Sequence, residues 1–264
     1  LSQHLSKDEI QTLRIAALLN DVGHGPFSHV FEHLLVKFLD KTHEDMTTWI
    51  IQKSELSDII SKVGYDPKVI GNLAVVALHK PGKAFIDQII CSAVDVDKLD
   101  FVVRDTYHTG AEYGYVDIFR LIHTLDVLGE NLAVEIGALS ALESLLIARI
   151  ESFKSIYFHR VGRAAQIMLS SAMDRANDEL GLARFKTPEQ YLAMDDYTVY
   201  AMLKGCSKSK AIIVDLENRK LIKCAYERTF YEKDTMISNI FSRENYRRQL
   251  QSEIAEEADA ETDS

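Results

Sequence analysis

Apolar residues recur every three or four positions along most of this chain, which is the spacing of helices with one buried face. Few prolines and glycines interrupt the pattern, so it predicts a mainly helical protein. Ser28 and Thr42 are expected to cap the helices that they begin. The expected helices cover Lys7–Leu19, Ser28–Leu39, Thr42–Lys53, Ser57–Val63, Pro67–Leu78, Phe85–Arg104, Asp117–Leu128 and Thr187–Leu203, with Ala138–Leu180 forming one or two more.

Three short segments rich in branched apolar residues predict strands. One is Leu132–Ile136, and the other two, Ala211–Leu216 and Lys220–Tyr226, flank a turn-like segment. No internal repeat or linker divides the chain. We therefore expect a helical core over residues 1–204, a small α+β segment over 205–250 and an acidic, disordered tail over 251–264.

Composition limits the class of protein. Hydrophobic residues make up 47% and charged residues 27%, as in ordinary soluble globular proteins. The longest apolar runs, such as Ile15–Leu19, are far shorter than the ~20 residues that cross a membrane, and no signal segment opens the chain. Because the chain starts at Leu1, directly in helix-like sequence, we expect its natural beginning to be missing.

The net charge of −10 comes largely from residues 253–264, which carry six acids and no base. The rest of the chain has a charge of only −4, so binding to nucleic acid through a broad basic surface is not expected. Cys91, Cys206 and Cys224 are odd in number and far apart. They are typical of reduced thiols in a cytoplasmic protein, not of a disulfide framework or zinc site.

Candidate chemistry begins at the end of the first expected helix. Four of the nine histidines fall within twenty residues, and acidic residues lie among them. Histidine binds metals and titrates near neutral pH, and a carboxylate that ends an apolar helix needs a partner or a metal. Ordinary surface or core histidines are the alternative. The members of this cluster are Asp21, His24, His29, Glu32, His33, His43 and Glu44.

A second candidate segment spans residues 95–105, where four aspartates alternate with apolar residues. Asp97, Phe101 and Asp105 are spaced by four and share one helix face. Asp100 and Arg104 share another face and are placed to pair. An inward-facing aspartate requires a cation, so this segment could complete a metal site with Asp21. A solvated acidic helix face is the alternative.

A third segment is basic and aromatic in an otherwise acidic protein. Arginine and lysine suit polyphosphates, and a tyrosine can stack on a base or sugar. Arg149 and Tyr157 share a helical face, whereas His159 lies on nearly the opposite one. A solvated helix is again the alternative. The residues concerned are Arg149, Lys154, Tyr157, His159, Arg160 and Arg163.

Taken in this order, the three segments resemble the HD-domain phosphohydrolases, and in particular their deoxynucleoside triphosphate (dNTP) triphosphohydrolase branch. The family stretch L-x-H-D-x-G-H-G-P-F-S-H is matched by L-L-N-D-V-G-H-G-P-F-S-H at residues 18–29. The family segment D-x-D-K/R-x-D-Y/F-x-x-R-D is matched at 95–105, and Y-x-H-K/R-V at 157–161. The resemblance runs from about Ala16 to about Tyr226 and implies a mainly α HD-domain helical bundle with a small α+β appendage.

The resemblance implies roles for individual residues. By position, Asn20, Asp21 and Asp97 match metal ligands, and the metal is expected to be Mn²⁺, Fe²⁺, Zn²⁺ or Mg²⁺. The positions that match catalytic histidines and their acidic partner are His24, His29, Glu32 and His43. The positions that match residues holding phosphates, sugar and base are Lys98, Asp105, Arg149, Tyr157, His159 and Arg160.

Two departures from the family pattern concern the metal. The family's first metal histidine lies about forty residues before the HD pair, and only nineteen residues precede Asn20 here. Asn20 itself replaces the histidine of that pair, and a neutral amide oxygen suits Mg²⁺ or Ca²⁺ better than Zn²⁺, Fe²⁺ or Mn²⁺. Milder changes are Glu32 for an aspartate and Phe101 for a tyrosine.

The first functional hypothesis is therefore a metal-dependent hydrolase that converts dNTPs to deoxynucleoside and tripolyphosphate. The second is a catalytically inactive HD protein that binds nucleotide and acts through partners, which Asn20 favours. The third is an HD phosphodiesterase or phosphatase for another nucleotide. The resemblance also implies a homo-oligomer, with a nucleotide effector as a further possible ligand.

Overall fold

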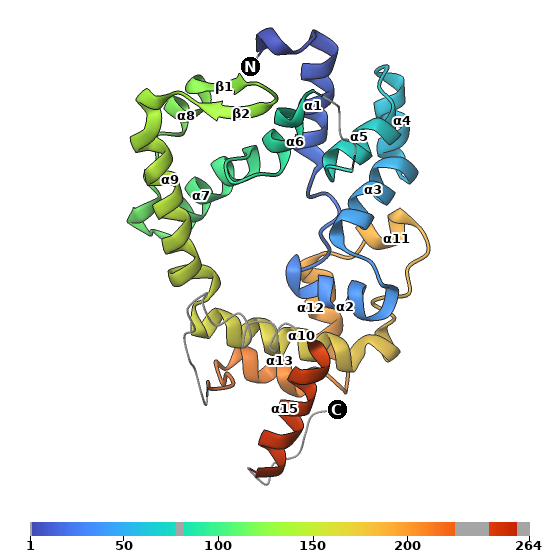
Figure 1. Ribbon diagram of the computed structural model, residues 1–264. Coiled ribbons are helices and arrows are strands. Elements are labelled where there is room, and N and C mark those ends of the chain that lie inside the picture. The colour runs from blue at the N-terminus through green and yellow to red at the C-terminus, as the bar shows by residue number, and fades with distance from the viewer. Residues whose placement is uncertain (1, 78–81, 225–242, 258–264) are drawn as a thin grey trace. The chain divides into compact units, whose positions relative to one another are not determined.

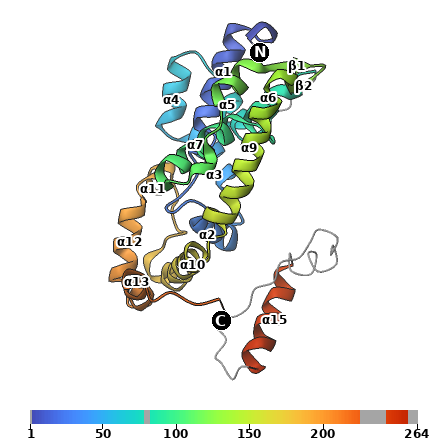
Figure 2. The same ribbon diagram turned by 90° about the vertical axis from the view of Figure 1, so that its left-hand side faces the viewer.

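The structure is a computed structural model that describes residues 2–77, 82–224 and 243–257. It divides into two compact units, Leu1–Lys223 and Cys224–Ser264. The first unit is built almost entirely of helices and holds one two-stranded sheet among its described residues (Figures 1 and 2). The mainly α fold class is confirmed. No helix in the described ranges is long and apolar enough to cross a membrane.

The helices of the first unit follow one another with short connections. They are α1 (Lys7–Leu19), α2 (His29–Leu39), α3 (His43–Lys53), α4 (Glu55–Lys62), α5 (Pro67–Ala74), α6 (Ala84–Ile90), α7 (Val96–Thr109), α8 (Ile118–Thr124), α9 (Leu139–Ser152), α10 (Arg160–Leu180), α11 (Pro188–Leu192), α12 (Asp196–Gly205) and α13 (Lys210–Glu217). Single turns are η1 (Ser2–His4), η2 (Glu112–Gly114), η3 (Ile136–Ala138) and the π-helical η4 (Phe153–Tyr157). In the second unit, α15 covers Glu244–Glu257.

The apolar faces of these helices form three buried clusters. The first joins α2 and α3 to α10–α13 and contains Phe31, Met173 and Tyr191. The second packs α1 against α3–α6, and the third joins α7, α8 and α9. Burying such side chains contributes about 1.5–3 kcal/mol each, so these clusters fix the helices on which the candidate residues lie.

The expected long helix Phe85–Arg104 is in fact two helices. Residues 91–95 break it, and Asp95 caps α7 by accepting a hydrogen bond from the backbone N–H of Lys98 at 2.8 Å. The same carboxylate accepts the backbone N–H of Ser92 at 2.9 Å. The first N–H groups of a helix have no partner within that helix. A buried cap that accepts one of them, as Asp95 does from Lys98, stabilises the start of a new helix at residue 96.

The sheet was only half predicted. Strand β2 (Asn131–Val134) confirms the expected strand near residues 132–136, but Leu125–Leu128, expected to end a helix, forms its antiparallel partner β1. Leu128 and Asn131 face each other across a two-residue turn in which Gly129 has a φ of 63°. A glycine at the first turn position is a hairpin signal, and it went unrecognised here.

The expected strand Ala211–Leu216 is wrong, because these residues belong to α13. Ile213 is fully buried in the first cluster, with Ile212 and Leu216 packed against it at helical spacing. Packing against α10 therefore decides the conformation of this branched apolar run. Of the other expected strand, residues 220–224 form no strand, and 225–226 lie outside the described residues.

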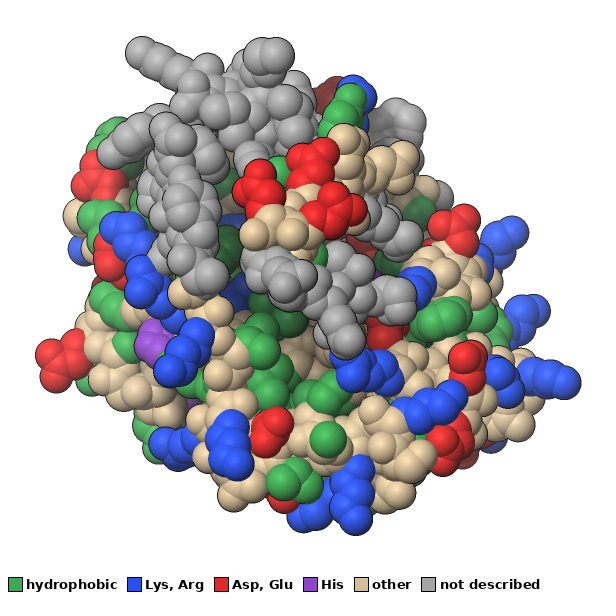
Figure 3. All heavy atoms as spheres, turned by 90° about the horizontal axis from the view of Figure 1, so that it is seen from below, with side chains coloured by type: hydrophobic (Ala, Val, Ile, Leu, Met, Phe, Trp, Pro, Cys, Tyr) green, Lys and Arg blue, Asp and Glu red, His purple; other side chains and the backbone are tan. Residues whose placement is uncertain are grey.

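The domain boundary expected at residue 204 stays a prediction. Residues 251–257 of the expected disordered tail belong to α15, and 258–264 lie outside the described residues. On the face drawn in Figure 3, lysine and arginine side chains are interspersed with acidic and apolar ones. No continuous basic surface covers the described part of that face.

Candidate active site

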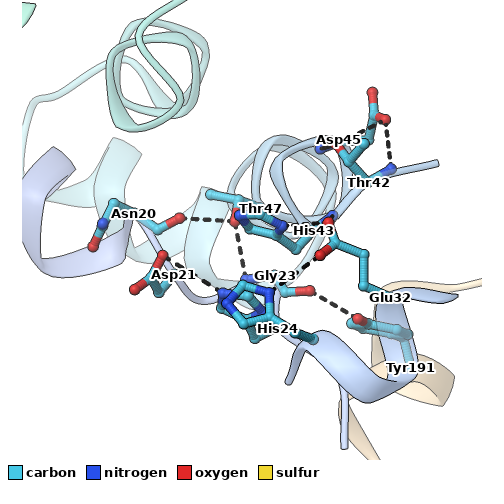
Figure 4. A network of polar contacts seen from close by, with 11 residues as sticks. Asn20, Asp21, Gly23, His24, Glu32, Thr42, His43, Asp45, Thr47 and Tyr191 are labelled. Carbon is cyan, nitrogen blue, oxygen red and sulfur yellow. Dashed lines mark hydrogen bonds and ion pairs between the residues drawn. The ribbon is translucent and has the colours of Figure 1, made fainter. Parts of the chain in front are cut away.

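The connection from α1 to α2 carries the G-H-G-P-F-S-H stretch, and α3 holds it from one side. The buried hydroxyl of Thr47 accepts the backbone N–H of Gly23 at 3.0 Å and donates to the backbone oxygen of Asn20 at 2.9 Å (Figure 4). A side chain on Gly23 would lie 2.2 Å from the backbone oxygen of His43. Glycine is required here because the loop runs against the backbone of α3.

Glu32, on the first turn of α2, joins two histidines. Its Oε1 lies 2.5 Å from Nδ1 of His43, and its Oε2 lies 3.2 Å from Nδ1 of His29. Burial alone would raise the pKa of Glu32, but the hydrogen bonds with His43 and His29 outweigh it and lower that pKa to about 2. The ionised carboxylate thus accepts from Nδ1 of both rings and leaves their Nε2 atoms for chemistry.

His24 completes a group of three close rings. Its ring is stacked on that of His43, with centroids 4.2 Å apart and planes 9° from parallel, and it meets His29 edge-on at 4.8 Å. Burial lowers the pKa of His24, and the positive charge of His43 lowers it further. Its Nδ1 is buried without a hydrogen-bond partner among the described residues. A neutral imidazole with an unused nitrogen is suited to accept or pass a proton.

The three histidines do not form a ready-made metal centre, although their ring nitrogens lie within 4.8 Å of one another. An imidazole nitrogen directs its lone pair in the plane of the ring. Because the planes of His24 and His43 are stacked and nearly parallel, one ion cannot lie in both. The group as arranged favours proton transfer and charge stabilisation over metal coordination.

Two further carboxylates lie on other elements, Asp21 in the α1–α2 connection and Asp97 on α7. Burial raises the pKa of Asp97, in the first turn of α7, and the negative charge of Asp21 raises it further. The negative charges of these two carboxylates, one in the α1–α2 connection and one on α7, thus disfavour each other. A divalent cation relieves such repulsion, and carboxylates are the ligands that Mg²⁺ and Mn²⁺ prefer. The residues present fit a divalent ion held by Asp21 and Asp97, with Asn20 adjacent.

A third part of the site joins α7 to the π-helical turn η4. The hydroxyl of Tyr157 donates a hydrogen bond to the carboxylate of Asp105, and its ring lies 6.3 Å from that of Phe101. Burial and Asp105 raise the pKa of Tyr157, and Asp97 adds to the effect. Asp97, Asp105 and Tyr157 thus lie in one neighbourhood, as their positions in the family pattern imply.

The remaining candidates lie on α7, on α9 and at the start of α10. The ammonium group of Lys98 binds the carboxylate of Asp95, and the guanidinium of Arg149 lies 5.9 Å above the ring of Phe153. His159 precedes α10 at its N-cap position without a side-chain cap bond, and Arg160 is the first residue of that helix. Their phosphate- and sugar-binding roles stay predictions.

The structure adds two residues that sequence reasoning missed. Thr47 lies one helical turn after His43, and that spacing was the available signal. Tyr191, on α11, is fully buried and donates its hydroxyl proton to the backbone oxygen of Gly23 at 2.8 Å (Figure 4). Nothing in the sequence marks Tyr191, because the contact spans 168 positions.

Comparison with known proteins identifies the family of this chain. The family model described as "HD associated region" matches residues 116–264, more than half of the chain. Similar curated proteins are the uncharacterised YwfO of Bacillus subtilis, 33% identical over 61% of this chain and 36% of that protein, and the deoxynucleoside triphosphate triphosphohydrolase SAMHD1 homolog of Dictyostelium discoideum, 30% identical over 83% of this chain and 45% of that protein. The chain spans about half the length, or less, of these relatives.

Solved structures share the fold. A hypothetical protein from Aquifex aeolicus superposes with a TM-score of 0.75 at 28% identity, over 90% of this chain and 63% of that one. A phosphohydrolase from Bacteroides thetaiotaomicron superposes with a TM-score of 0.71 at 22% identity, over 97% of this chain and 66% of that one. The helical architecture is shared with these structures, and in this chain it brings His24, His29 and His43 together. The chain belongs to the HD-domain, dNTPase-like proteins that carry the HD associated region.

Proposed function

We propose that this chain carries the active site of a divalent-metal-dependent hydrolase that converts dNTPs to deoxynucleoside and tripolyphosphate. The observation that carries the proposal is the histidine group bridged by Glu32, with the carboxylate of Asp21 beside His24. His24 Nε2 lies 3.8 Å from Asp21 Oδ1, which connects the two halves of the site. The name of the Dictyostelium relative supports the choice of substrate class.

In this proposal, the histidines move protons and stabilise charge. Water attacks the α-phosphorus, and the bond from that phosphorus to the 5′ oxygen of the sugar breaks. His24, kept neutral by burial, accepts the proton of the attacking water. His29 is exposed and bound to Glu32, and it donates a proton to the departing 5′ oxygen. Asp21 and Asp97 would hold a divalent ion, which would supply Lewis acidity toward a phosphate oxygen.

The nucleotide is bound by the second half of the site. Tyr157, fixed by Asp105, presents an aromatic face for the sugar and base. Arg149 and Lys98 supply positive charge for the β- and γ-phosphates, together with Arg160 and His159 at the start of α10. Several cationic side chains of this kind suit the several negative charges of a polyphosphate substrate.

Asn20 supports a second candidate, an inactive nucleotide-binding protein. Its amide replaces a charged or imidazole ligand, which weakens binding of transition metals. The two candidates are separated by measuring tripolyphosphate release from each of the four dNTPs with Mn²⁺ or Mg²⁺. The longest natural reading frame that contains these residues is used, unchanged and as the Asn20→His variant.

Release by both proteins, or by the histidine variant alone, supports the hydrolase. Binding of dNTPs without release by either protein supports the inactive binding protein. A parallel panel of cyclic dinucleotides and guanosine polyphosphates tests the third hypothesis. Turnover of those compounds alone would reassign the substrate class.

A further inference from the structure

The backbone that leads into α2 is strained at two consecutive residues. Phe27 has a φ of 59° and Ser28 a φ of 51°, and neither is glycine. Residues other than glycine rarely adopt this backbone conformation, and it persists only where the surrounding structure enforces it. The strained pair lies directly before His29, so the same turn sets the direction in which His29 leaves the loop.

Local contacts do not account for this turn. Ser28 occupies the N-cap position of α2 but makes no side-chain cap bond, contrary to the capping role expected from the sequence. The backbone bonds nearby, from Ser28 N–H to the oxygen of Gly25 and from Val30 N–H to that of Phe27, are compatible with many loop conformations. The force that holds the turn must therefore come from another element.

Helix α12 supplies two contacts to the strained residue. The carboxylate Oδ1 of Asp196, the first residue of α12, accepts the backbone N–H of Phe27 at 2.8 Å. Further along the same helix, the ring of Tyr200 lies 6.5 Å from that of Phe27, within the first buried cluster. Both the backbone and the side chain of Phe27 are thus held from α12.

The preceding segment, α11, holds the other end of the loop. Tyr191 donates its hydroxyl proton to the backbone oxygen of Gly23, immediately before His24. Its ring packs edge-on against Phe31 of α2, with centroids 6.1 Å apart. The backbone at Gly25 runs close to α2, since a Cβ atom there would lie 2.5 Å from the ring of Phe31. The loop from 23 to 29 is therefore clamped at both ends.

We propose that Asp196 and Tyr191 are positioning residues, which fix the loop so that His24 and His29 face the same reacting phosphate. Both lie within residues 116–264, so the inference gives part of the HD associated region a direct task in the histidine site. Asp196 is exposed and adds little to the buried core, so its contact serves geometry more than stability. The catalytic consequence rests on the proposed hydrolase, whereas the geometric one does not.

The geometric test uses the whole 264-residue chain with ¹³C-labelled histidine. Ring ¹H–¹³C cross-peaks of His24 and His29 are assigned by single substitution and compared among variants. Asp196→Ala should shift or broaden both, and Asp196→Asn, which retains an oxygen acceptor, should restore them. The matched control is Asp195→Ala, which removes the cap of α12 at Thr198 without removing the contact to Phe27. It should lower the melting temperature and leave both cross-peaks in place.

Tyr191→Phe gives an independent arm, because it removes a single O–H and keeps the packed ring. It should displace the His24 cross-peak, whereas Tyr197→Phe, at an exposed tyrosine of α12, should not. Cross-peaks unmoved by both Asp196→Ala and Tyr191→Phe, or moved equally by the Asp195→Ala control, would overturn the proposal.

With dNTP as substrate, Asp196→Ala should lower kcat about tenfold, with KM within about twofold of the unchanged chain, because misaligned groups lose transition-state contacts before binding. Asp196→Asn should recover most of that loss. If neither the unchanged chain nor any variant hydrolyses dNTPs, but the cross-peaks move as expected, the hydrolase proposal is wrong. The positioning roles of Asp196 and Tyr191 then still stand. An unchanged kcat in the Asp196→Ala variant would contradict the positioning role of Asp196.

Discussion

Oε1 of Glu32 lies 2.5 Å from Nδ1 of His43, and the other oxygen of the same carboxylate reaches His29. Glu32 therefore holds two of the three histidines in place. Its hydrogen bonds with them lower the pKa of Glu32 from an ordinary value of 4.5 to about 2. The ionised form is bound more strongly in the folded protein than in the unfolded one. Its contribution to stability is therefore complete above pH 4.5 and disappears as the pH falls toward 2.

Glu32→Gln should lower the free energy of unfolding by about 1–3 kcal/mol at pH 7, because a charge-assisted hydrogen bond is lost. The difference between the two proteins should shrink between pH 4.5 and pH 2. Urea unfolding at pH 7, 4 and 3 measures it. The exposed neighbour Glu44 provides the control, since Glu44→Gln should change stability by less than about 0.5 kcal/mol at every pH. A pH-independent difference would show that the carboxylate charge is not what matters.

Gly23→Ala should disrupt the loop, because the new methyl group would lie 2.2 Å from backbone atoms of His43 and Thr47. We expect a loss of at least about 2 kcal/mol, since the backbone of α3 would have to move. Gly205, at the end of α12, has open space around it, and Gly205→Ala should be neutral or stabilising by up to about 1 kcal/mol. Thermal unfolding of the two variants compares them directly. Equal stability of both would refute the close approach at Gly23.

Asp97→Asn should separate stability from metal binding. Burial and Asp21 raise the pKa of Asp97, so its ionised form destabilises the metal-free fold at neutral pH. With EDTA present, the variant should be more stable than the unchanged chain, by up to about 1 kcal/mol after solvent screening. Added Mn²⁺ should raise the melting temperature of the unchanged chain and not that of the variant.

Asp100→Asn is the matched control on the same helix, because Asp100 is exposed and pairs with Arg104 at 2.9 and 2.8 Å. It should retain stabilisation by Mn²⁺. An Asp97→Asn protein that is still stabilised by Mn²⁺ to the same extent would remove Asp97 from the metal site.

Tyr157 should stay protonated at a pH where ordinary tyrosines ionise, because burial and Asp105 raise its pKa. The ordinary tyrosine pKa is about 10, so phenolate absorbance followed to about pH 11 reports the exposed rings. Tyr157→Phe should leave that absorbance rise unchanged. A smaller rise in the Tyr157→Phe variant would show that the phenol is accessible and not bound to Asp105.

The sequence predicts the helical class correctly, because helical periodicity is a local signal. The predictions from sequence are wrong where packing between distant segments determines the conformation of the backbone. The run at 211–216 looks like a strand from its branched residues, yet burial of Ile213 against the first cluster makes it a helix. Helical periodicity predicts one continuous helix over 85–104, but the capping Asp95 begins a separate helix there.

The same limit applies to the site. Sequence order places Glu32 three residues after His29, so their contact follows from helical geometry, as does the facing of Asp97 and Phe101. The contacts of Tyr191 and Asp196 span 168 and 169 positions, and no local pattern announces them. The sequence identifies the clustered histidines and acids, and it does not identify the distant residues that contact their loop.

The central claim is tested most directly by hydrolysing a mixture of the four dNTPs in H₂¹⁸O, with Mn²⁺ or Mg²⁺, and identifying the products by ³¹P NMR and mass spectrometry. The account predicts deoxynucleoside and tripolyphosphate, with ¹⁸O in the tripolyphosphate alone, since water attacks the α-phosphorus. It also predicts that His29→Ala abolishes most of this turnover. Formation of deoxynucleoside monophosphate with pyrophosphate, or ¹⁸O in the deoxynucleoside, would contradict it.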